Sequence, residues 1–283
     1  MRVRRTVDSV SVSAAAARYD HSVGPFARPF AAAIARAVTR GGAVTRGGAV
    51  TKGGAAQSVL DHGAGTGLVT KLLRRWDPSL AITALDPSEE FLTGLSGESN
   101  VEILVGTASA ARPRSYGAIV SNLALMFCAD PLEDLRALRR AATHGASLHL
   151  TVLGPVEEVQ PFWRYWSAVA AVVPGAWSPD RYRQHCLGDA RLLAPMVVAA
   201  GWDDVSITKI RSSRRIGAAA AWRWLVGALP VGRCVNGDES YGPLETCYHD
   251  AVRAAFLQAW PDRTWPTSAA LLVGARAGRS GPT

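Results

Sequence analysis

The 283-residue sequence has few cysteines, few lysines and no long apolar run, and each shortage excludes a class of protein. Its cysteines, Cys128, Cys186, Cys234 and Cys247, form no CxxC pair and have no histidine at metal-ligand spacing, so neither a disulfide framework nor a zinc site is indicated. No stretch reaches the roughly 20 apolar residues of a membrane span, and Asp8 interrupts the start where a signal peptide needs an apolar run. A reducing cytoplasm is therefore the expected location.

Lysine is limited to Lys52, Lys71 and Lys209, although the formal net charge is +8. A basic excess first suggests binding to nucleic acid or to an acidic membrane surface. Here the excess is arginine scattered along an alanine-rich chain, which is typical of the codon bias of a GC-rich genome. Hydrophobic residues make up 48% and charged residues 19%, the usual mix of a folded globular protein.

The N-terminal part is expected to be helical and then flexible. Apolar residues between Ala14 and Val38 recur every three or four positions, and Gly24-Pro25 and Pro29 divide the predicted helix into two short ones. Residues 38–55 then read VTRGGA, VTRGGA and VTKGGA, and the paired glycines with few apolar side chains predict a linker. We expect cap helices over residues 1–37 and a linker over residues 38–55.

After the linker, short β-rich runs alternate with helical segments, which indicates a parallel sheet with crossover helices. The seven expected strands are Ser58–Leu60, Leu80–Leu85, Val101–Val105, Gly117–Val120, Ser147–Leu153, Val205–Ile210 and Ala269–Ala275. Asp130 and Pro131 suit the start of a helix that Gly145 ends, and a further helix is expected over Asp189–Ala200.

One glycine-rich turn carries most of the chemical information. An apolar strand leads through Asp61 and His62 into Gly63–Gly67, with glycine at every second position, and an amphipathic helix follows. Glycine is needed where a ligand approaches the backbone so closely that a Cβ would obstruct it. The spacing is not the GxGxxG that seats a pyrophosphate on a helix N-terminus, so a dinucleotide site is disfavoured.

This DxGxGxG arrangement resembles motif I of the class I S-adenosylmethionine (SAM) dependent methyltransferases, in the small-molecule branch of ubiquinone/menaquinone type. The resemblance implies an α/β, Rossmann-like fold: a seven-stranded, mostly parallel sheet with helices on both faces, N-terminal helices and a helical lid insertion. It also implies SAM as the cofactor, with its amino acid and ribose portions on the glycine turn. Asp86, after the second strand, would receive both ribose hydroxyls.

Further cofactor-binding positions follow from the same resemblance. They are Pro87 after Asp86, Thr107 and Ala108 on the adenine-side loop, Asn122 and Leu123 facing the methyl group, Tyr19 in an N-terminal A-x-Y-D element that covers the cofactor, and Asp61, Gly63, Ala64, Gly65 and Gly67 at the turn. His62 stands where the family has an apolar residue, and a buried, hydrogen-bonded structural role is favoured for it.

Methyl transfer from a sulfonium needs alignment of acceptor, methyl and sulfur more than it needs a base. For an acceptor that must lose a proton, a histidine or carboxylate near the methyl would help. The candidate bases are His21, His185, Glu157 or Glu158, and His149, although His149 alternates with leucines and is favoured as a core residue. No metal ligand is predicted.

An aromatic insertion between the fifth strand and the next helix is the expected acceptor side. A helix from Pro161 to Val173 would carry Trp163, Tyr165 and Trp166 toward the carboxyl edge of the sheet, where ligands of open α/β sheets bind. A core role and a pocket role are equally favoured for this aromatic stripe. The predicted substrate-pocket residues are Trp163, Trp166, Phe127 and Tyr165, the lid is residues 155–188, and the SAM-binding domain is residues 56–154 and 189–283.

The favoured function is SAM-dependent methyl transfer to a small, fairly hydrophobic intermediate, which can be aromatic, in bacterial secondary metabolism such as antibiotic biosynthesis. A monomer or homodimer with no nucleic-acid or membrane partner is expected. One alternative is a protein of the same fold that binds SAM but catalyses a step such as cyclisation, because motif I reports cofactor binding and not the reaction. A nucleic-acid methyltransferase is less favoured, since Ser121-Asn122-Leu123-Ala124 replaces the [DN]-P-P-[YF] element of exocyclic base methylation. A nonenzymatic SAM-binding or scaffold protein is the remaining alternative.

Overall fold

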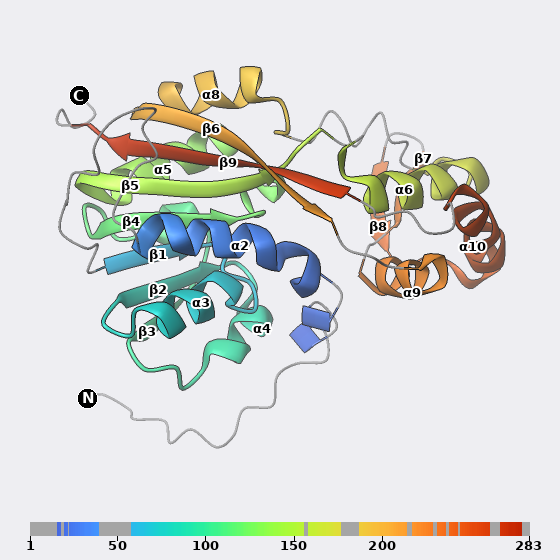
Figure 1. Cartoon of the computed structure of the whole chain (residues 1–283), viewed down its shortest axis with the longest axis horizontal. Helices are drawn as coiled ribbons and strands as arrows, with labels where there is room; N and C mark the ends of the chain where they lie inside the picture. The colour runs from blue at the N-terminus through green and yellow to red at the C-terminus, as the bar shows by residue number, and fades with distance from the viewer. Residues whose placement is uncertain are drawn as a thin grey trace.

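The computed structural model describes residues 16–17, 20–21, 23–39, 58–155, 158–176, 187–213, 217–228, 231–235, 238–242, 244–260 and 267–278. Its main sheet has seven strands in the order β3-β2-β1-β4-β5-β9-β6 (Figure 1). The strands are β1 (Ser58–His62), β2 (Ala81–Asp86), β3 (Val101–Val105), β4 (Tyr116–Asn122), β5 (Ala142–Leu153), β6 (Trp202–Ser213) and β9 (Thr267–Ala277). All seven predicted strands are confirmed, although β5 begins five residues earlier and β6 three residues earlier than expected.

The direction of the strands makes the sheet Rossmann-like. Strands β3, β2, β1, β4 and β5 run parallel, so their carboxyl ends meet at one edge. Strand β9 is antiparallel to both β5 and β6 and lies between them. The expected fold class, a mostly parallel seven-stranded sheet, is confirmed.

Helices cover both faces of this sheet. Helices α2 (Gly24–Thr39) and α3 (Leu68–Trp76) pack on one face, where Ile34 and Leu73 are fully buried. Helices α5 (Pro131–Ala141) and α8 (Ala190–Ala199) cover the other face through Leu138 and Val197. Their capping explains where both helices begin: Asp130 accepts a hydrogen bond from the backbone N–H of Glu133, and Asp189 accepts one from that of Arg191.

The division of the N-terminal helix at Pro29 was wrong. Helix α2 continues through Pro29 to Thr39 without a break. Proline removes only one backbone hydrogen bond near the start of the helix. The burial of Phe26, Phe30 and Ile34 along the helix outweighs that loss.

A second group of elements lies beyond the carboxyl edge of the sheet, at the right of Figure 1. It contains α6 (Gln160–Val172), α9 (Ala218–Ala228) and α10 (Thr246–Ala259), together with the two-stranded sheet of β7 (Val231–Val235) and β8 (Asp238–Gly242). We call its core the aromatic group: Phe26, Phe30, Phe162, Tyr165, Trp166, Trp222, Trp224, Phe256 and Trp260. Helix α10 and the β7–β8 pair were not predicted, and the predicted linker lies almost entirely outside the described residues.

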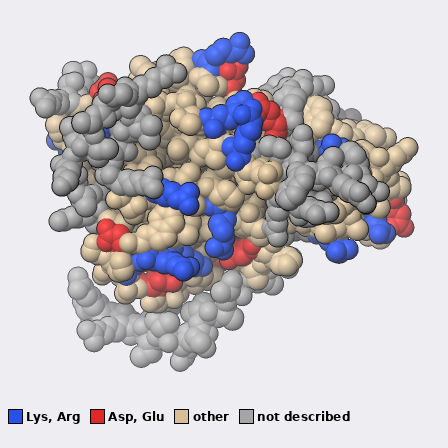
Figure 2. All heavy atoms as spheres, in the orientation of Figure 1, with Lys and Arg blue, Asp and Glu red and all other residues tan. Residues whose placement is uncertain are grey.

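Charged side chains are dispersed on the face that Figure 2 shows, with uncharged surface between the basic groups. Several arginines and lysines are paired with acids, as in Arg112–Glu102 and Lys209–Glu158. In the described part of the chain, no helix is long and apolar enough to cross a membrane.

Candidate functional site

The turn between β1 and α3 contains three glycines in the left-handed backbone region, with φ of 65° at Gly63, 53° at Gly65 and 83° at Gly67. A Cβ on Gly63 would lie 2.2 Å from the Cβ of Ala124, and one on Gly67 would lie 2.3 Å from the Leu95 side chain. A Cβ on Gly65 would meet no atom within 4 Å. Two glycines are therefore required by packing, whereas Gly65 faces open space that a ligand can enter.

Asp86 at the end of β2 supports this turn directly. Its Oδ2 accepts a hydrogen bond of 2.8 Å from the backbone N–H of Gly65, and its Oδ1 accepts one of 2.8 Å from that of Ser88. The carboxylate is buried beside the open side of the turn. A carboxylate held in this way can accept hydrogen bonds from vicinal hydroxyls, as the sequence predicts for a ribose.

Asp61 is also buried, but its carboxylate points into the start of helix α3. Its Oδ2 accepts hydrogen bonds from the backbone N–H of Thr70 at 3.0 Å and from the Thr70 hydroxyl at 2.6 Å. Burial raises the pKa of Asp61 to about 7, although the hydrogen bonds from Thr70 oppose that shift. Asp61 thus joins β1 to α3 and also lines the cleft described next.

A cleft lies over the turn, between the sheet edge and the N-terminal segment. The residues that line it are Asp20, Gly24, Ala27, Asp61, Gly63, Ala64, Gly65, Thr66, Leu68, Val69 and Asn122. The Thr66 hydroxyl donates a hydrogen bond to Asp20, which brings the N-terminal segment onto the glycine turn. Asp20 and Thr66 were missed as site residues, although Asp20 belongs to the A-x-Y-D element and Thr66 lies inside the glycine motif.

The loop after β4 forms the opposite wall of the cleft. Asn122 accepts a hydrogen bond of 2.8 Å from the Thr151 hydroxyl through its Oδ1. Leu123 has a φ of 57°, which is unfavourable for a residue with a Cβ, and its backbone N–H donates to Thr151 O at 3.0 Å. Strain of this kind is found at sites where the backbone must present a particular surface.

Of the remaining predicted cofactor residues that the structure describes, none lines this cleft, and Ala108 lines a different cavity. Pro87 and Thr107 are exposed, and Ala108 is buried at the start of the short helix η2 (Ala108–Ala110). Tyr19 lies outside the described residues. The structure therefore brings the turn, Asp61, Asp86 and Asn122-Leu123 together, with Pro87, Thr107 and Ala108 in the loops after β2 and β3.

The candidate bases do not converge on the cleft. His21 is exposed next to Asp20, whereas His185 and Glu157 lie outside the described residues. Glu158 forms ion pairs with Lys209 at 2.5 Å and Arg211 at 3.1 Å, and the hydrogen bond from Lys209 lowers its pKa. His149 is buried in β5, and burial lowers its pKa to about 4, which fits the favoured core role.

The predicted substrate residues differ in exposure. Tyr165 and Trp166 are buried in the aromatic group, and Trp163 is half-buried on the same helix. Phe127, in the short helix η3 (Leu125–Phe127) after the β4 loop, is 80% exposed. Burial favours the core role for Tyr165 and Trp166, whereas the exposed ring of Phe127 is free to contact a ligand.

His62 has the buried, hydrogen-bonded position expected for it. Its Nδ1 lies 3.2 Å from the Ser121 hydroxyl, and its Nε2 lies 4.0 Å from Oδ2 of Asp134. Burial lowers the pKa of His62, so the ring is neutral. The Cys128 thiol is beside the same carboxylate, and burial raises its pKa to about 12. The thiol keeps its proton in this state and is a poor nucleophile.

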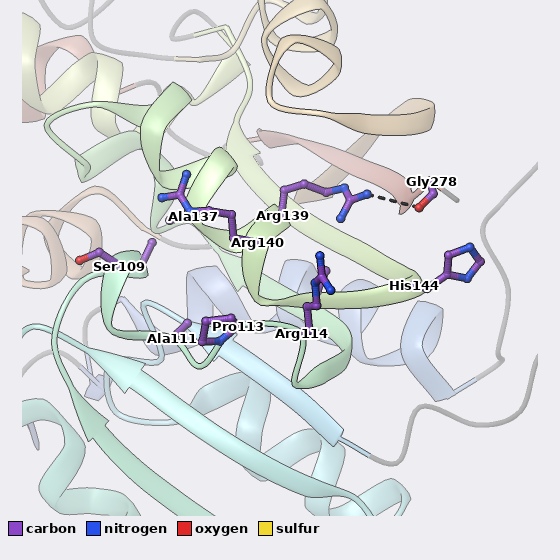
Figure 3. Close-up of a pocket in the computed structure, with 11 residues that line it drawn as sticks. Ser109, Ala111, Pro113, Arg114, Ala137, Arg139, Arg140, His144 and Gly278 are labelled. Carbon is purple, nitrogen blue, oxygen red and sulfur yellow. Dashed lines mark hydrogen bonds between the residues drawn. The ribbon is translucent and has the colours of Figure 1, made fainter. Parts of the chain in front are cut away.

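A larger cavity of about 550 Å³ lies away from this edge, between η2, α5 and the start of β5 (Figure 3). Arg114, Arg139, Arg140 and His144 line it, and Arg139 donates to Gly278 O at 3.3 Å across it. It contains neither the glycine turn nor an acid at a strand end. We therefore take the cleft over the glycine turn, and not the larger cavity, as the candidate cofactor site.

Comparison with known proteins agrees with this geometry. Residues 60–150 match a family described as a methyltransferase domain. No curated protein matches the sequence significantly.

Solved structures share the fold over most of the chain. A candidate methyltransferase from Bacillus halodurans is 14% identical with a TM-score of 0.55, covering 88% of this chain and 98% of its own. The plantazolicin methyltransferase BpumL, solved with a monoazolic desmethylPZN analogue and S-adenosylhomocysteine, is 14% identical with a TM-score of 0.53, covering 94% and 89%. A phosphoethanolamine N-methyltransferase of Haemonchus contortus, solved with SAM, is 14% identical with a TM-score of 0.51, covering 95% and 61%.

Proposed function

We propose that the chain is a class I SAM-dependent methyltransferase, as the methyltransferase-domain match and the fold support, and that it methylates a small, fairly hydrophobic, aromatic biosynthetic intermediate. In this proposal SAM lies on the open side of Gly65, with its ribose on Asp86 and its methyl group toward Asn122 and Leu123. The residues fit such a cofactor, because the open face of Gly65 adjoins a buried carboxylate at the end of β2.

The observation that supports an apolar acceptor is the contact between the aromatic group and the methyl-facing loop. Leu123 is buried in the same cluster as Phe26, Phe162 and Trp222, which come from three different helices. The rings of Phe26 and Phe162 meet edge to face with centroids 4.8 Å apart. An acceptor that enters beside Leu123 would therefore meet ring and aliphatic surface from α2, α6 and α9.

Two polar atoms near this surface support an acceptor that also carries a hydrogen-bonding group. The Tyr165 hydroxyl and the Trp224 indole N–H are buried and find no hydrogen-bond partner within the described residues. A buried donor without a partner costs about 1–3 kcal/mol. A substrate oxygen or nitrogen placed near either donor would recover part of that cost.

The reaction needs little more from the protein than alignment. The positive sulfonium activates the methyl group when SAM is bound, and fixing donor and acceptor in line can supply about 7–11 kcal/mol. The glycine turn and Asp86 would fix the cofactor, and Phe127 with the aromatic group would fix the acceptor. No candidate base among the described residues lines the cleft, so a positioning mechanism is the better-supported one.

The test is a transfer assay with methyl-labelled SAM and a panel of small acceptors, matched in reacting group but differing in apolar surface. We expect label to move to aromatic phenols or amines in preference to their polar counterparts, with one S-adenosylhomocysteine released per methyl transferred. Conversion of an acceptor at unchanged mass without S-adenosylhomocysteine would instead support the cyclisation alternative. Transfer to RNA but to no small acceptor would overturn the proposal.

A matched pair of variants tests the acceptor side. Phe127→Ala removes an exposed ring from η3, which follows the Asn122-Leu123 loop, and Leu192→Ala removes a side chain that is 66% exposed on α8, on the far side of the sheet. We expect Phe127→Ala to raise the KM for the acceptor severalfold with SAM affinity unchanged, and Leu192→Ala to alter neither. An unchanged KM in the Phe127 variant would remove this residue from the acceptor site.

A further inference from the structure

We propose that His62, Cys128 and Asp134 form a binding site for one zinc ion, separate from the cofactor cleft. Their ligand atoms, an imidazole nitrogen, a thiol sulfur and a carboxylate oxygen, all lie within 4.8 Å of one another. The three residues come from the end of β1, the turn after η3 and helix α5. The fold thus brings together side chains that are up to 72 residues apart in the sequence.

The distances suit a tetrahedral metal after an adjustment of the side chains. Zinc bonds of about 2.0–2.3 Å place neighbouring ligand atoms roughly 3.3–3.8 Å apart. His62 Nε2 and Asp134 Oδ2 are 4.0 Å apart and all three ligand atoms lie within 4.8 Å of one another, so each pair must approach by at most about 1.5 Å. Asp134 can supply that movement, because its side chain is 22% exposed whereas that of His62 is 6% exposed.

Ser121 holds the His62 ring in a suitable orientation. The Ser121 hydroxyl lies 3.2 Å from Nδ1, so the ring can donate Nδ1–H to it and turn the lone pair of Nε2 toward Cys128 and Asp134. Metal-bound histidines are usually fixed in this way by a second hydrogen-bonding group. The exposed edge of Asp134 provides a route by which an ion can enter.

The donor set selects the metal. A thiolate, an imidazole and a carboxylate match the mixed nitrogen, sulfur and oxygen ligands of zinc, whereas calcium and magnesium prefer oxygen ligands alone. The described residues contain no fourth protein ligand at this cluster. A water molecule would complete the tetrahedron.

Zinc binding releases one proton from the protein. The Cys128 S–H bond breaks, its sulfur forms a bond to zinc, and the proton leaves to solvent; the neutral His62 ring and the Asp134 carboxylate bind without further proton loss. The ion would connect the backbone just before Gly63 to the loop that carries Ala124. These two segments already touch, because a Cβ on Gly63 would lie 2.2 Å from Ala124.

The test is metal content and cobalt spectroscopy of the full chain. Protein stripped with a chelator is incubated with Zn²⁺, desalted and analysed, and a second sample is loaded with Co²⁺. We expect one zinc retained per chain, and a thiolate-to-cobalt charge-transfer band together with the visible bands of a four-coordinate ion. Cys128→Ser and Asp134→Asn should each weaken zinc binding at least about tenfold and remove or shift these bands.

Matched controls use residues of the same type outside the cluster. Cys247→Ser removes an exposed thiol and His144→Ala removes an exposed histidine, and both should bind zinc as the wild type does. If folded wild-type protein retains no zinc, or if Cys128→Ser retains it equally well, the proposal is wrong and the cluster is a hydrogen-bonded one. SAM affinity, measured by calorimetry on metal-free protein, keeps this outcome distinct from any failure of the proposed function.

Discussion

The glycine turn and the aromatic group lie at the same edge of the sheet but are built from different interactions. The turn is held by backbone geometry and polar atoms, with Asp86 accepting from Gly65 and Asp61 accepting from Thr70. The aromatic group is held by apolar side chains from α2, α6, α9 and α10. In the proposed function the polar turn holds a cofactor of constant structure, and the apolar aromatic group faces the acceptor.

The largest effect should come from a tryptophan inside the aromatic group. Trp166 is 7% exposed and its ring lies edge to face with Tyr165 at 5.5 Å. We expect Trp166→Ala to lower the free energy of unfolding by about 3–5 kcal/mol, as for other buried aromatic truncations. SAM affinity of the folded fraction should stay within about twofold, because the proposed cofactor contacts lie on the glycine turn and Asp86.

The control is Trp76, which is 39% exposed at the end of α3. Trp76→Ala should cost clearly less than Trp166→Ala, about 1 kcal/mol, because more than a third of the side chain is already exposed to solvent. Urea unfolding of both variants, with calorimetric titration of SAM, makes the comparison. A Trp166 variant of normal stability but without SAM binding would place this residue in the cofactor site. That result would contradict the division of roles between the glycine turn and the aromatic group.

A branched side chain at the open glycine should act on the turn alone. Gly65→Val would place methyl groups in the space that faces the cleft, so SAM affinity should fall at least about a hundredfold, or about 2.7 kcal/mol. Gly97 is the matched control, because it also has a positive φ, of 91°, and open space around its Cβ position. Gly97→Val should show similar backbone strain with unchanged SAM affinity; equal losses in both variants would mean that strain and not obstruction is responsible.

The pH dependence of stability should reveal the polar support beneath the turn. The folded pKa of Asp61, about 7, is above its unfolded value of 3.8, so folding favours the protonated acid. Its contribution is therefore complete below about pH 4 and is lost as pH rises toward about 7. From about pH 5 to about pH 8 this loss should be about 2–3 kcal/mol.

Asp61→Asn cannot ionise, and its amide oxygen can still accept from Thr70. The variant should therefore lack this fall in stability and should gain relative to the wild type as pH rises. Urea unfolding at the two pH values measures the difference. Parallel profiles for wild type and variant would show that Asp61 is ionised throughout and that the turn tolerates a buried charge.

The smallest effect should come from neutralising the acid at the end of β2. Asp86→Asn keeps the shape of the side chain but replaces charge-assisted hydrogen bonds with neutral ones, so SAM affinity should fall about tenfold. Asp77 is the control, because its carboxylate also accepts backbone and hydroxyl hydrogen bonds, from Ser79, but at an exposed helix end. If Asp77→Asn and Asp86→Asn bind SAM equally well, the ribose does not lie on Asp86.

The same contrast explains how much could be predicted from the sequence. The turn is local: Asp61 and Gly63–Gly67 are contiguous, and Asp86 ends the next strand, so a motif predicts their meeting. The hydrogen bond from the Gly65 N–H to Asp86 was not predicted. The motif assigned the Asp86 side chain to a ligand, whereas the structure shows that it also supports the backbone of the turn. Helix α10 was missed because no capping signal marks its start: its first turn has no acid and its N-cap makes no side-chain hydrogen bond.

Contacts that depend on distant segments could not be predicted at all. His62 and Asp134 approach only because β1 and α5 lie at the same edge of the finished sheet, and no spacing rule connects them. The burial of Tyr165 and Trp166 depends likewise on α9 and α10, which begin more than 50 residues later. Sequence periodicity predicts that these side chains share one face of a helix, but it does not identify the helices that pack against that face.

Helices α6, α9 and α10 belong to two chain segments, each of which leaves the sheet and returns to it at a neighbouring residue. One segment leaves the sheet at Gly154 and returns at Gly188. These two glycines are in contact, because a Cβ on Gly188 would lie 2.5 Å from the Gly154 carbonyl carbon. The other leaves β6 at Ser213 and re-enters β9 at Thr267, and these two residues are paired partners in the sheet. Segments whose ends are neighbours can be exchanged or grafted with little disturbance to their host. Helices α6, α9 and α10 can in this sense be exchanged as units, while the strand order and the glycine turn stay unchanged.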